Sequence, residues 1–322
     1  MTRDFTEITV VGEDDTGLIA EVTTLLFERS INIEDLDQAV REGVFRMTMH
    51  VDTSEMVCTE DKLREDLNDL GDDLGVDVKV RFPADRETQQ IAVLVTKESH
   101  CLEAIFEAWA SGDLDADVNV VIGNHPDLKP LAEKYEVPFH DIGDENGNPD
   151  EDQLLDLLAE YDADLIVLAR YMRILSPDVV FRYESQIINV HPSLLPAFPG
   201  AEAYLQALEE GVRIAGVTAH YVTTDLDQGP IITQRAFNVP QGSDVKAEDL
   251  RTIGQPLEAD ALLEAIDLHL NDDVAVHRGR TQLRDPEDSS AQLGAPTELN
   301  DMIPDRPIDG LGEFVAEQEA DD

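Results

Sequence analysis

The sequence predicts an α/β protein made of two folded parts in succession: a small α+β domain, then a larger doubly wound domain with a mostly parallel sheet. Two patterns lead to this prediction. In residues 5–82 the apolar runs follow the order β-α-β-β-α-β, and from Ile91 onward short apolar strands alternate with helical patterns. The chain of 322 residues is also long enough for two separate hydrophobic cores.

The first predicted domain covers residues 1–83. Alternating side chains predict strands at 5–11, 45–51 and 76–82 and the start of another strand at 31–33. Helical spacing predicts helices at 18–30 and 59–74. Residues 12–17 form the loop before the first helix. This order of elements is typical of a ferredoxin-like fold. A polar segment that contains proline, residues 84–90, is predicted to be a linker.

The second predicted domain covers residues 91–284. Strands are expected at 91–95, 118–122, 165–169, 187–190 and 281–283, and helices at 100–111, 127–135, 150–161 and 257–270. In an open parallel sheet, ligands bind beyond the carboxyl ends of the strands. Functional side chains are therefore expected in the segments that follow these strands.

Acidic residues dominate the composition. The formal net charge is −47, and Lys accounts for only six of the 23 basic residues. Self-repulsion of this size destabilises a compact chain in dilute buffer, whereas salt near 1 M shortens the screening length to about 3 Å. We interpret the acidity as adaptation to a high-salt cytoplasm; the alternative is a protein that binds cations or basic partners. Nucleic acid is excluded as a partner, because phosphate binding requires clustered Lys and Arg.

Residues 285–322 hold twelve acidic residues and one Arg, and they are predicted to be a disordered tail. Short apolar stretches within it offer the alternative of docking on a partner. Two cysteines, Cys58 and Cys101, imply no disulfide framework. No signal peptide or membrane-spanning run is evident, so a cytoplasmic protein that does not bind membranes is expected.

The most informative segment is Asn189-Val190-His191-Pro192. Residues 186–191 read as a short buried strand, whose period of two sends Asn189 and His191 to the same side. Pro192 then ends the strand and turns the chain. An amide donor thus lies beside a titratable ring at the end of a strand.

A carboxylate completes this set. Asp227 lies in the loop that follows a second β-branched run, residues 217–222, within which His220 is expected to be structural or to support a catalytic residue from behind. Taken singly, Asn189 can cap a turn, His191 can be a hydrogen-bonded core residue and Asp227 can form a turn. Together the three supply the parts needed for acyl or formyl transfer.

At this point a family resemblance becomes plain. Segment 189–234 resembles the catalytic half of the formyltransferases that use 10-formyltetrahydrofolate, in which an Asn-X-His pair and a distant Asp form the active site. Segments 95–102, 121–125 and 168–175 agree with it in order. Together they are similar to the formyltetrahydrofolate deformylase family over roughly residues 5–284. The first domain, with Gly17-Leu18-Ile19-Ala20 opening its first helix, resembles an ACT domain, a module that usually senses amino acids.

The resemblance implies hydrolysis of 10-formyltetrahydrofolate to formate and tetrahydrofolate, a one-carbon reaction that serves purine synthesis, without a permanently bound cofactor. Asn189 would donate to the developing oxyanion, a contact worth roughly 3–4 kcal/mol. His191 would add a second donor and move protons. Asp227 would orient and stabilise the imidazole, or bind the attacking water.

The resemblance also implies two binding regions. The residues expected to wrap the folate are Met172, Arg173, Ile174, Leu175, Thr223, Thr224 and Asp225. The residues expected to bind an amino-acid effector, at an interface that implies a homo-oligomer, are Gly12, Asp14, Gly17, Leu18 and Ile19. The first region also has non-functional explanations. Ile174 and Leu175 can belong to a buried segment that follows a strand, and Arg173 can form a surface ion pair. No metal site is expected, because no His-X-X-X-His or Cys-X-X-Cys pair occurs.

Two other functions compete with hydrolysis. Glycinamide ribonucleotide formyltransferase resembles this chain at Pro192, where deformylases usually have a second His. That family, however, holds the substrate phosphate with a Gly-Ser-Asn type loop, whereas residues 96–100 here lack glycine and include Glu98, which would repel a phosphate. The second alternative is an amino-acid-sensing regulator without turnover, and the intact Asn189, His191 and Asp227 argue against it.

Overall fold

The structure, a computed structural model, describes residues 5–41, 43–82, 88–240, 242, 245–271, 273–277 and 279–283. The expected tail at 285–322 and most of the expected linker lie outside the described residues. In the described part of the chain, no helix has the length and apolarity that crossing a membrane requires.

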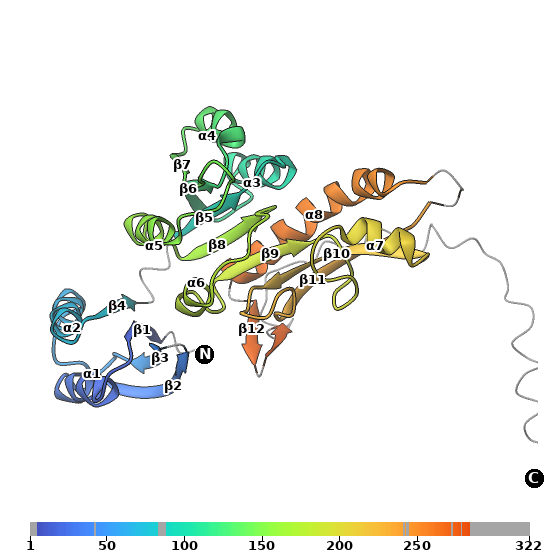
Figure 1. Ribbon diagram of the computed structural model, residues 1–322. Helices are drawn as coiled ribbons and strands as arrows, with labels where there is room; N and C mark the ends of the chain where they lie inside the picture. The colour runs from blue at the N-terminus through green and yellow to red at the C-terminus, as the bar shows by residue number, and fades with distance from the viewer. Residues whose placement is uncertain are drawn as a thin grey trace, which may run out of the picture. The chain divides into compact units, whose positions relative to one another are not determined.

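The first domain has the predicted β-α-β-β-α-β order. Its elements are β1 (Thr6–Glu13), α1 (Leu18–Glu28), β2 (Asn32–Arg41), β3 (Val44–Asp52), α2 (Glu60–Leu74) and β4 (Val76–Arg81). The strands form an antiparallel sheet in the order β2-β3-β1-β4. Both helices pack on one face of this sheet, where alternate residues of β3 such as Phe45 and Met47 are buried against Leu26 and Leu67 (Figure 1).

β1 continues two residues beyond the expected boundary, through Gly12 and Glu13. Gly12 pairs with Phe45 on one side and with Val76 on the other. A Cβ atom at position 12 would lie 2.6 Å from Cγ1 of Val76, so only glycine lets the strands approach this closely.

The second domain contains a sheet of seven strands in the order β11-β10-β9-β8-β5-β6-β7. Its helices and strands are β5 (Gln89–Val95), α3 (His100–Ser111), β6 (Ala116–Gly123), the 3-10 helix η2 (Pro126–Leu128), α4 (Lys129–Lys134), β7 (Phe139–Asp141), α5 (Glu151–Glu160), β8 (Leu165–Ala169), α6 (Pro177–Arg182), β9 (Ile187–His191), α7 (Ala203–Glu209), β10 (Ile214–Tyr221), β11 (Ile231–Asn238) and α8 (Ala247–Leu270). Strands β12 (Val274–His277) and β13 (Arg280–Leu283) form a separate pair.

The five neighbouring strands β9, β8, β5, β6 and β7 run parallel to one another, whereas β10 and β11 are antiparallel to their neighbours. The predicted mostly parallel sheet is therefore confirmed. Helices α3, α4 and α8 cover one face of the sheet, and α5 and α6 cover the other (Figure 1). Because both faces are covered, β5 and β8 consist almost entirely of buried apolar residues.

α8 begins at Ala247, ten residues before the expected start, and passes through Pro256. Proline lacks an N–H and normally ends a helix. Here the helix has buried residues on both sides of Pro256: Leu250 packs in a cluster with Tyr204 of α7, and Leu262 packs in the core cluster of the sheet. At Gly254 it approaches Tyr204 so closely that a Cβ atom would lie 1.9 Å from the tyrosine hydroxyl.

α2 shows how the surface carries the negative charge. Its apolar side chains Leu63 and Leu67 are buried, while Glu60 and Asp61 in the first turn and Asp72 and Asp73 near the last turn are exposed. Negative charge is favourable at a helix N-terminus and unfavourable at its C-terminus, where this helix has no basic residue.

We therefore expect the double variant Asp72→Asn/Asp73→Asn to be more stable than the wild type by about 1 kcal/mol at low salt. The gain should shrink in about 1 M KCl, where charges are screened. Thermal unfolding at both salt concentrations measures it. The matched variant Glu60→Gln/Asp61→Asn removes the same charge from the other end of α2 and should show no gain. Equal stabilisation by both variants would contradict the helix-dipole argument.

Candidate active site

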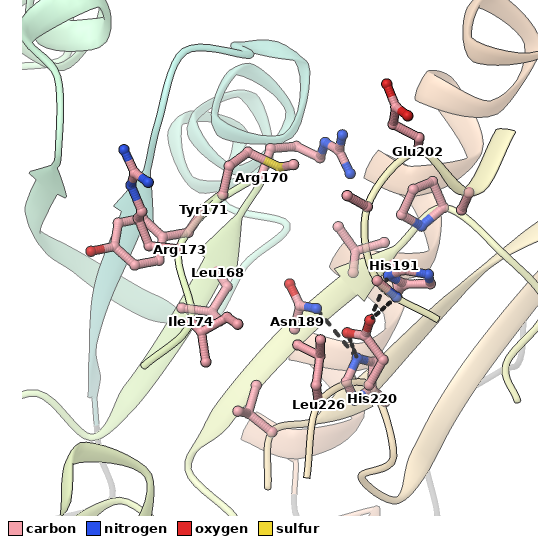
Figure 2. Close-up of a pocket in the computed structure, with 18 of the residues that line it drawn as sticks. Leu168, Arg170, Tyr171, Arg173, Ile174, Asn189, His191, Glu202, His220 and Leu226 are labelled. Atoms are coloured by element: carbon pink, nitrogen blue, oxygen red, sulfur yellow. Dashed lines mark hydrogen bonds and ion pairs between the residues drawn. The ribbon is translucent and has the colours of Figure 1, made fainter. Parts of the chain in front are cut away.

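The segments that follow β8, β9 and β10 surround a cavity of about 530 Å³. The three residues predicted to be catalytic, Asn189, His191 and Asp227, all line it (Figure 2). Segment 172–175 also lines it, as the resemblance implied. A cavity of this size fits a small organic ligand.

Asn189 is held by a partner in the neighbouring strand. In the antiparallel pairing of β9 with β10, Asn189 lies directly opposite His220, so the two side chains are neighbours on one face. The amide nitrogen of Asn189 lies 3.3 Å from Nε2 of His220. His220 therefore supports Asn189 from behind, which is one of the two roles expected for it. The pairing of His220 with Asn189 follows from the strand register, and a single sequence does not reveal that register.

The protonation of His220 fixes the orientation of the Asn189 amide. Nδ1 of His220 donates its N–H to the carbonyl oxygen of Tyr221 at 2.9 Å. Burial lowers the pKa of His220, so the ring is neutral and its Nε2 is a hydrogen-bond acceptor. The Asn189 nitrogen must then be the group that faces it. One N–H of Asn189 is used in this bond, and the second is left for a ligand.

His191 is buried, with 5% of its surface exposed. Its Nε2 donates to the carbonyl oxygen of Phe198 at 2.9 Å, and its Nδ1 lies 3.4 Å from Oδ2 of Asp227. An imidazole held beside a carboxylate can take up a proton from a reacting group and return it.

Asp227 is fixed between the two imidazoles. Its Oδ2 accepts the backbone N–H of Gly200 at 2.7 Å, and its Oδ1 lies 4.0 Å from Nε2 of His220. The residue has a positive φ of 53°, and its side chain is only 7% exposed. The left-handed backbone turns the carboxylate back from the loop toward His191.

Thr218 holds the turn after His191. Thr218 pairs with His191 in the strand register, donates its hydroxyl to the carbonyl of Ser193 at 2.7 Å and accepts the N–H of Leu195 at 3.0 Å. This turn presents the carbonyl of Phe198 to His191. Its closure thus depends on a buried hydroxyl in β10.

One side of the cavity is apolar. Met172 and Ile174 are 52% and 73% exposed, although large apolar side chains are usually buried. Leu226, which belongs to the loop expected to contact the folate, is 49% exposed and also lines the cavity. Leu175 lines it too but is itself buried in the core. The exposed side chains form an apolar wall.

Arg173 is turned away from His191 (Figure 2). Its Nε donates to the carbonyl of Gly147 at 2.8 Å, and its Nη2 donates to the carbonyl of Asn146 at 2.9 Å. These bonds replace the surface ion pair that was the alternative for this residue. The guanidinium therefore anchors the apolar wall to the loop 143–149.

A chain of hydrogen bonds joins the same wall to β5 and β6. The N–H of Met172 donates to the hydroxyl of Thr96 at 2.8 Å, and that hydroxyl donates to Oδ1 of Asn124 at 2.8 Å. Nδ2 of Asn124 then donates to the carbonyl of Gly147 at 2.7 Å. Asn124 is fully buried, and its amide links three segments that are distant in the sequence.

The loop after β10 contributes only part of what was expected. Thr223 and Thr224 line the cavity, but Asp225 is not among its lining residues. The carbonyl of Asp225 instead closes the loop, accepting the hydroxyl of Thr223 and the N–H of Gln228, each at 3.2 Å. The position of Asp225 is therefore explained by its part in forming this turn.

The other side of the cavity is charged. Arg170, at the end of β8, lies with its Nε 3.1 Å from Oε2 of Glu98 and 3.3 Å from Oε2 of Glu258. His100 Nε2 lies 3.0 Å from Glu258, and the hydroxyl of Tyr204 donates to Glu258 at 2.6 Å. We call these five residues the Arg170 cluster. From the sequence, Glu98 is expected to repel a phosphate, but the cluster is not predicted, because its members come from segments that are far apart in the sequence.

Glu258 is the buried centre of this cluster, with 1% of its surface exposed. Burial alone would raise the pKa of its carboxyl group, but the hydrogen bond from His100 and the charge of Arg170 outweigh burial and lower that pKa. Burial likewise opposes the charge of Arg170, but Glu258 and Glu98 outweigh it, so the pKa of Arg170 is raised. Glu258 and Arg170 are therefore both charged near neutral pH.

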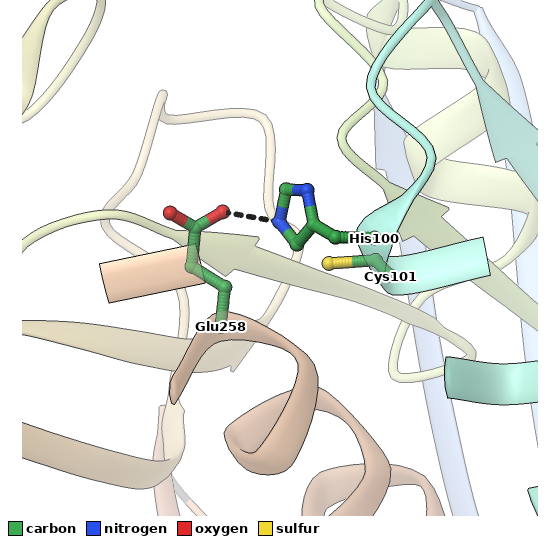
Figure 3. A group of neighbouring side chains, drawn as sticks. All are labelled: His100, Cys101 and Glu258. Carbon is green, nitrogen blue, oxygen red and sulfur yellow. Dashed lines mark hydrogen bonds and ion pairs between the residues drawn. The ribbon is translucent and has the colours of Figure 1, made fainter. Parts of the chain in front are cut away.

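His100, Cys101 and Glu258 also lie close enough to suggest a metal site, since their ligand atoms are within 4.8 Å of one another (Figure 3). Both oxygens of Glu258 are already engaged, one of them by the cationic Arg170. Burial also raises the pKa of the Cys101 thiol, so it is not a thiolate. The donor set therefore does not fit a metal ion.

The residues expected to bind an effector lie around the end of β1 and the start of α1. Gly17 precedes α1 with a φ of +99°, and Asp14 and Ile19 are exposed. The side chain of Leu18 is buried in the core of the first domain, so only its backbone can meet a ligand.

Comparison with known proteins agrees with this architecture. The ACT domain family model matches residues 7–81, and the formyl transferase family model matches residues 89–266. The formyltetrahydrofolate deformylase of Bacillus subtilis is 37% identical, over 83% of this chain and 90% of that protein.

Solved structures extend the comparison. A formyltetrahydrofolate deformylase from Pseudomonas syringae pv. tomato is 30% identical with a TM-score of 0.60, covering 87% of this chain and 94% of that one. Glycinamide ribonucleotide transformylase 1 from Symbiobacterium toebii is 34% identical with a TM-score of 0.58, but covers only 62% of this chain and 95% of its own.

The buried Glu258 predicts a pH-dependent stability. Because its pKa is lowered by folding, the stabilisation is present near pH 7 and is lost as the pH falls through the lowered pKa. Glu258→Gln should cost about 3 kcal/mol near neutrality, since it leaves Arg170 with one carboxylate. The difference from wild type should narrow by about pH 4.

Urea unfolding at both pH values, in high salt, measures this effect. Glu264→Gln is the matched control: it breaks a partly exposed pair with Arg235, and it should cost less than about 1 kcal/mol. A loss for Glu258→Gln that is the same at every pH would refute the linkage.

Proposed function

The chain belongs to the formyltetrahydrofolate deformylase family, and on that basis we propose that it hydrolyses 10-formyltetrahydrofolate to formate and tetrahydrofolate. One observation carries the proposal: Asn189, His191 and Asp227 meet in one cavity beside an apolar wall. The substrate is bound only for the reaction, and the mechanism requires no other cofactor.

Asn189 stabilises the oxyanion. When water attacks the formyl carbon, negative charge develops on the formyl oxygen. The second N–H of Asn189, left after its bond to His220, donates to that oxygen. A donor preorganised in this way contributes roughly 3–4 kcal/mol to the transition state.

His191 and Asp227 move the protons. Nε2 of His191 is engaged by Phe198, so Nδ1, which faces Asp227, is the nitrogen that meets the reaction. The pair takes a proton from the attacking water and delivers a proton to the amine nitrogen as the C–N bond breaks. The leaving amine departs neutral, and formate is released.

The apolar wall receives the folate rings. Met172, Ile174 and Leu226 present exposed apolar surface to the cavity, and burying it against a flat aromatic ligand is favourable. We assign Thr223, Thr224 and the backbone of segment 172–175 to the same task. Arg173 supports this wall from behind rather than contacting the folate through its guanidinium.

Formyl transfer to glycinamide ribonucleotide is the second candidate, favoured by Pro192 after His191 and by the likeness to a glycinamide ribonucleotide transformylase. Against it, Glu98 lines the cavity where a phosphate would need donors. The transformylase likeness also covers a smaller share of this chain than the deformylase likeness does. Hydrolysis is therefore the better supported function.

We further propose that the ACT domain binds an amino acid near residues 12–19 and that this domain joins copies of the chain into a homo-oligomer. The high density of acidic residues supports action in a salt-rich cytoplasm. Formate and tetrahydrofolate released there would serve purine synthesis and the balance of one-carbon pools.

The activity is tested in KCl of about 1 M, where the acidic surface is screened. We expect formate from 10-formyltetrahydrofolate without any added amine. His191→Ala should lower the rate by about 10²–10⁴-fold, because the proton-transfer pair is lost. Formate release is assayed directly, and circular dichroism checks folding.

The matched control is His140→Ala. His140 lies on β7, at the far edge of the sheet, and its side chain forms a hydrogen bond with Tyr161. This variant should keep the wild-type rate. Tetrahydrofolate formed only when glycinamide ribonucleotide is present, with no formate, would instead establish the transferase. Substantial residual activity in His191→Ala would refute the role of this residue.

The effector proposal predicts that an amino acid such as glycine or methionine changes the rate of formate release about fivefold or more. Asp14→Ala should abolish the response, whereas Glu28→Ala, at the other end of α1, should preserve it. Light scattering reports the oligomeric state in parallel. A flat response to all twenty amino acids would remove the proposal.

A further inference from the structure

Arg170 adopts a backbone conformation that long side chains rarely occupy. Its φ is +60°, directly after β8, and its side chain is 9% exposed. Glycine occupies this region without steric cost, whereas a residue with a Cβ atom is strained there. Such strain is retained where the side chain has a task.

The side chain bridges two acidic residues from distant elements. Nε of Arg170 contacts Glu98, from the loop after β5, and Glu258, from α8. Glu258 is also held by His100 and Tyr204 and therefore remains paired without Arg170. His100 also links these two carboxylates, since its Nδ1 lies 3.9 Å from Glu98 and its Nε2 lies 3.0 Å from Glu258. Of the two links, only that of Arg170 comes from a residue that lines the cavity.

This bridge lies along the same cavity as the catalytic residues. Glu98, Arg170 and Tyr204 line it. In Figure 2 the guanidinium of Arg170 points away from Leu168 and Ile174, toward the side where Glu202 lies. With the folate on the apolar wall, as proposed above, the charged side is where the molecule that receives the formyl group must approach.

We propose that Arg170 is the specificity-determining residue that closes the acceptor side of the cavity, so that water alone reaches the formyl carbon. Its guanidinium occupies the space that an amine-bearing nucleotide would need. Its Nε and Nη2 are engaged by Glu98, and Nε also by Glu258, so these donors are not offered to a phosphate. The inference rests on the proposed function and adds the structural reason for the choice of acceptor.

The test removes the bridge without changing the net charge, in the double variant Glu98→Ser/Arg170→Gly. Glu258 keeps His100 and Tyr204, and position 170 gains the residue that its backbone favours. Binding of glycinamide ribonucleotide, the probe for a phosphorylated amine, is measured by calorimetry. We expect its dissociation constant to fall at least about tenfold relative to wild type.

The matched control is Glu248→Ser/Arg251→Gly, which removes another ion pair, one whose arginine also lines the cavity. It should bind the ribonucleotide as the wild type does. Should the first double variant not fold, Glu98→Gln/Arg170→Ala carries the same expectation, because it also removes the bridge without changing the net charge. A folded variant that binds no better than wild type, or equal gains in variant and control, would overturn the proposal.

Formate release by the wild type keeps the two hypotheses separate. A wild type without hydrolysis contradicts the proposed function, whatever the variants bind. A wild type that hydrolyses, with a variant that does not bind the ribonucleotide more tightly, contradicts only the role of Arg170. In the hydrolysing case, we also expect the ratio of formyl transfer to hydrolysis to rise in the variant.

Discussion

The antiparallel pairing of β9 with β10 is the constraint on which the site depends. It sets Asn189 opposite His220 and His191 opposite Thr218. The first pair orients an amide, and the second closes the turn that presents the Phe198 carbonyl to His191. A shift of one residue in this register would send the side chains of Asn189 and His191 to the opposite face of the sheet.

Local patterns predicted much of this architecture. Strand periodicity placed Asn189 and His191 on one side, and the alternation of strands and helices predicted the parallel sheet. What escaped prediction depends on contacts between distant segments. The sequence predicted a helix over 257–270, yet α8 begins ten residues earlier and passes through Pro256. His220 and Arg170 likewise become meaningful only once β9, β8 and α8 are assembled.

The cavity has two chemically different sides: one exposes apolar surface, and the other has charged groups that are paired within the protein. On the apolar side, exposed surface at Met172 and Ile174 is tolerated for a ligand to cover. On the charged side, the carboxylates Glu98 and Glu258 are balanced by Arg170 within the protein. In a chain with a net charge of −47, a buried guanidinium that neutralises local acids also limits repulsion inside the fold.

The carbonyl of Gly147 receives hydrogen bonds from both Asn124 and Arg173. Gly147 itself has a φ of +72°, and a Cβ atom there would lie 2.4 Å from the ring of His125. The two segments that donate to this carbonyl are therefore coupled in sequence evolution. A substitution that moves the carbonyl displaces both the apolar wall and the loop 143–149, so it requires compensating substitutions in all of these segments.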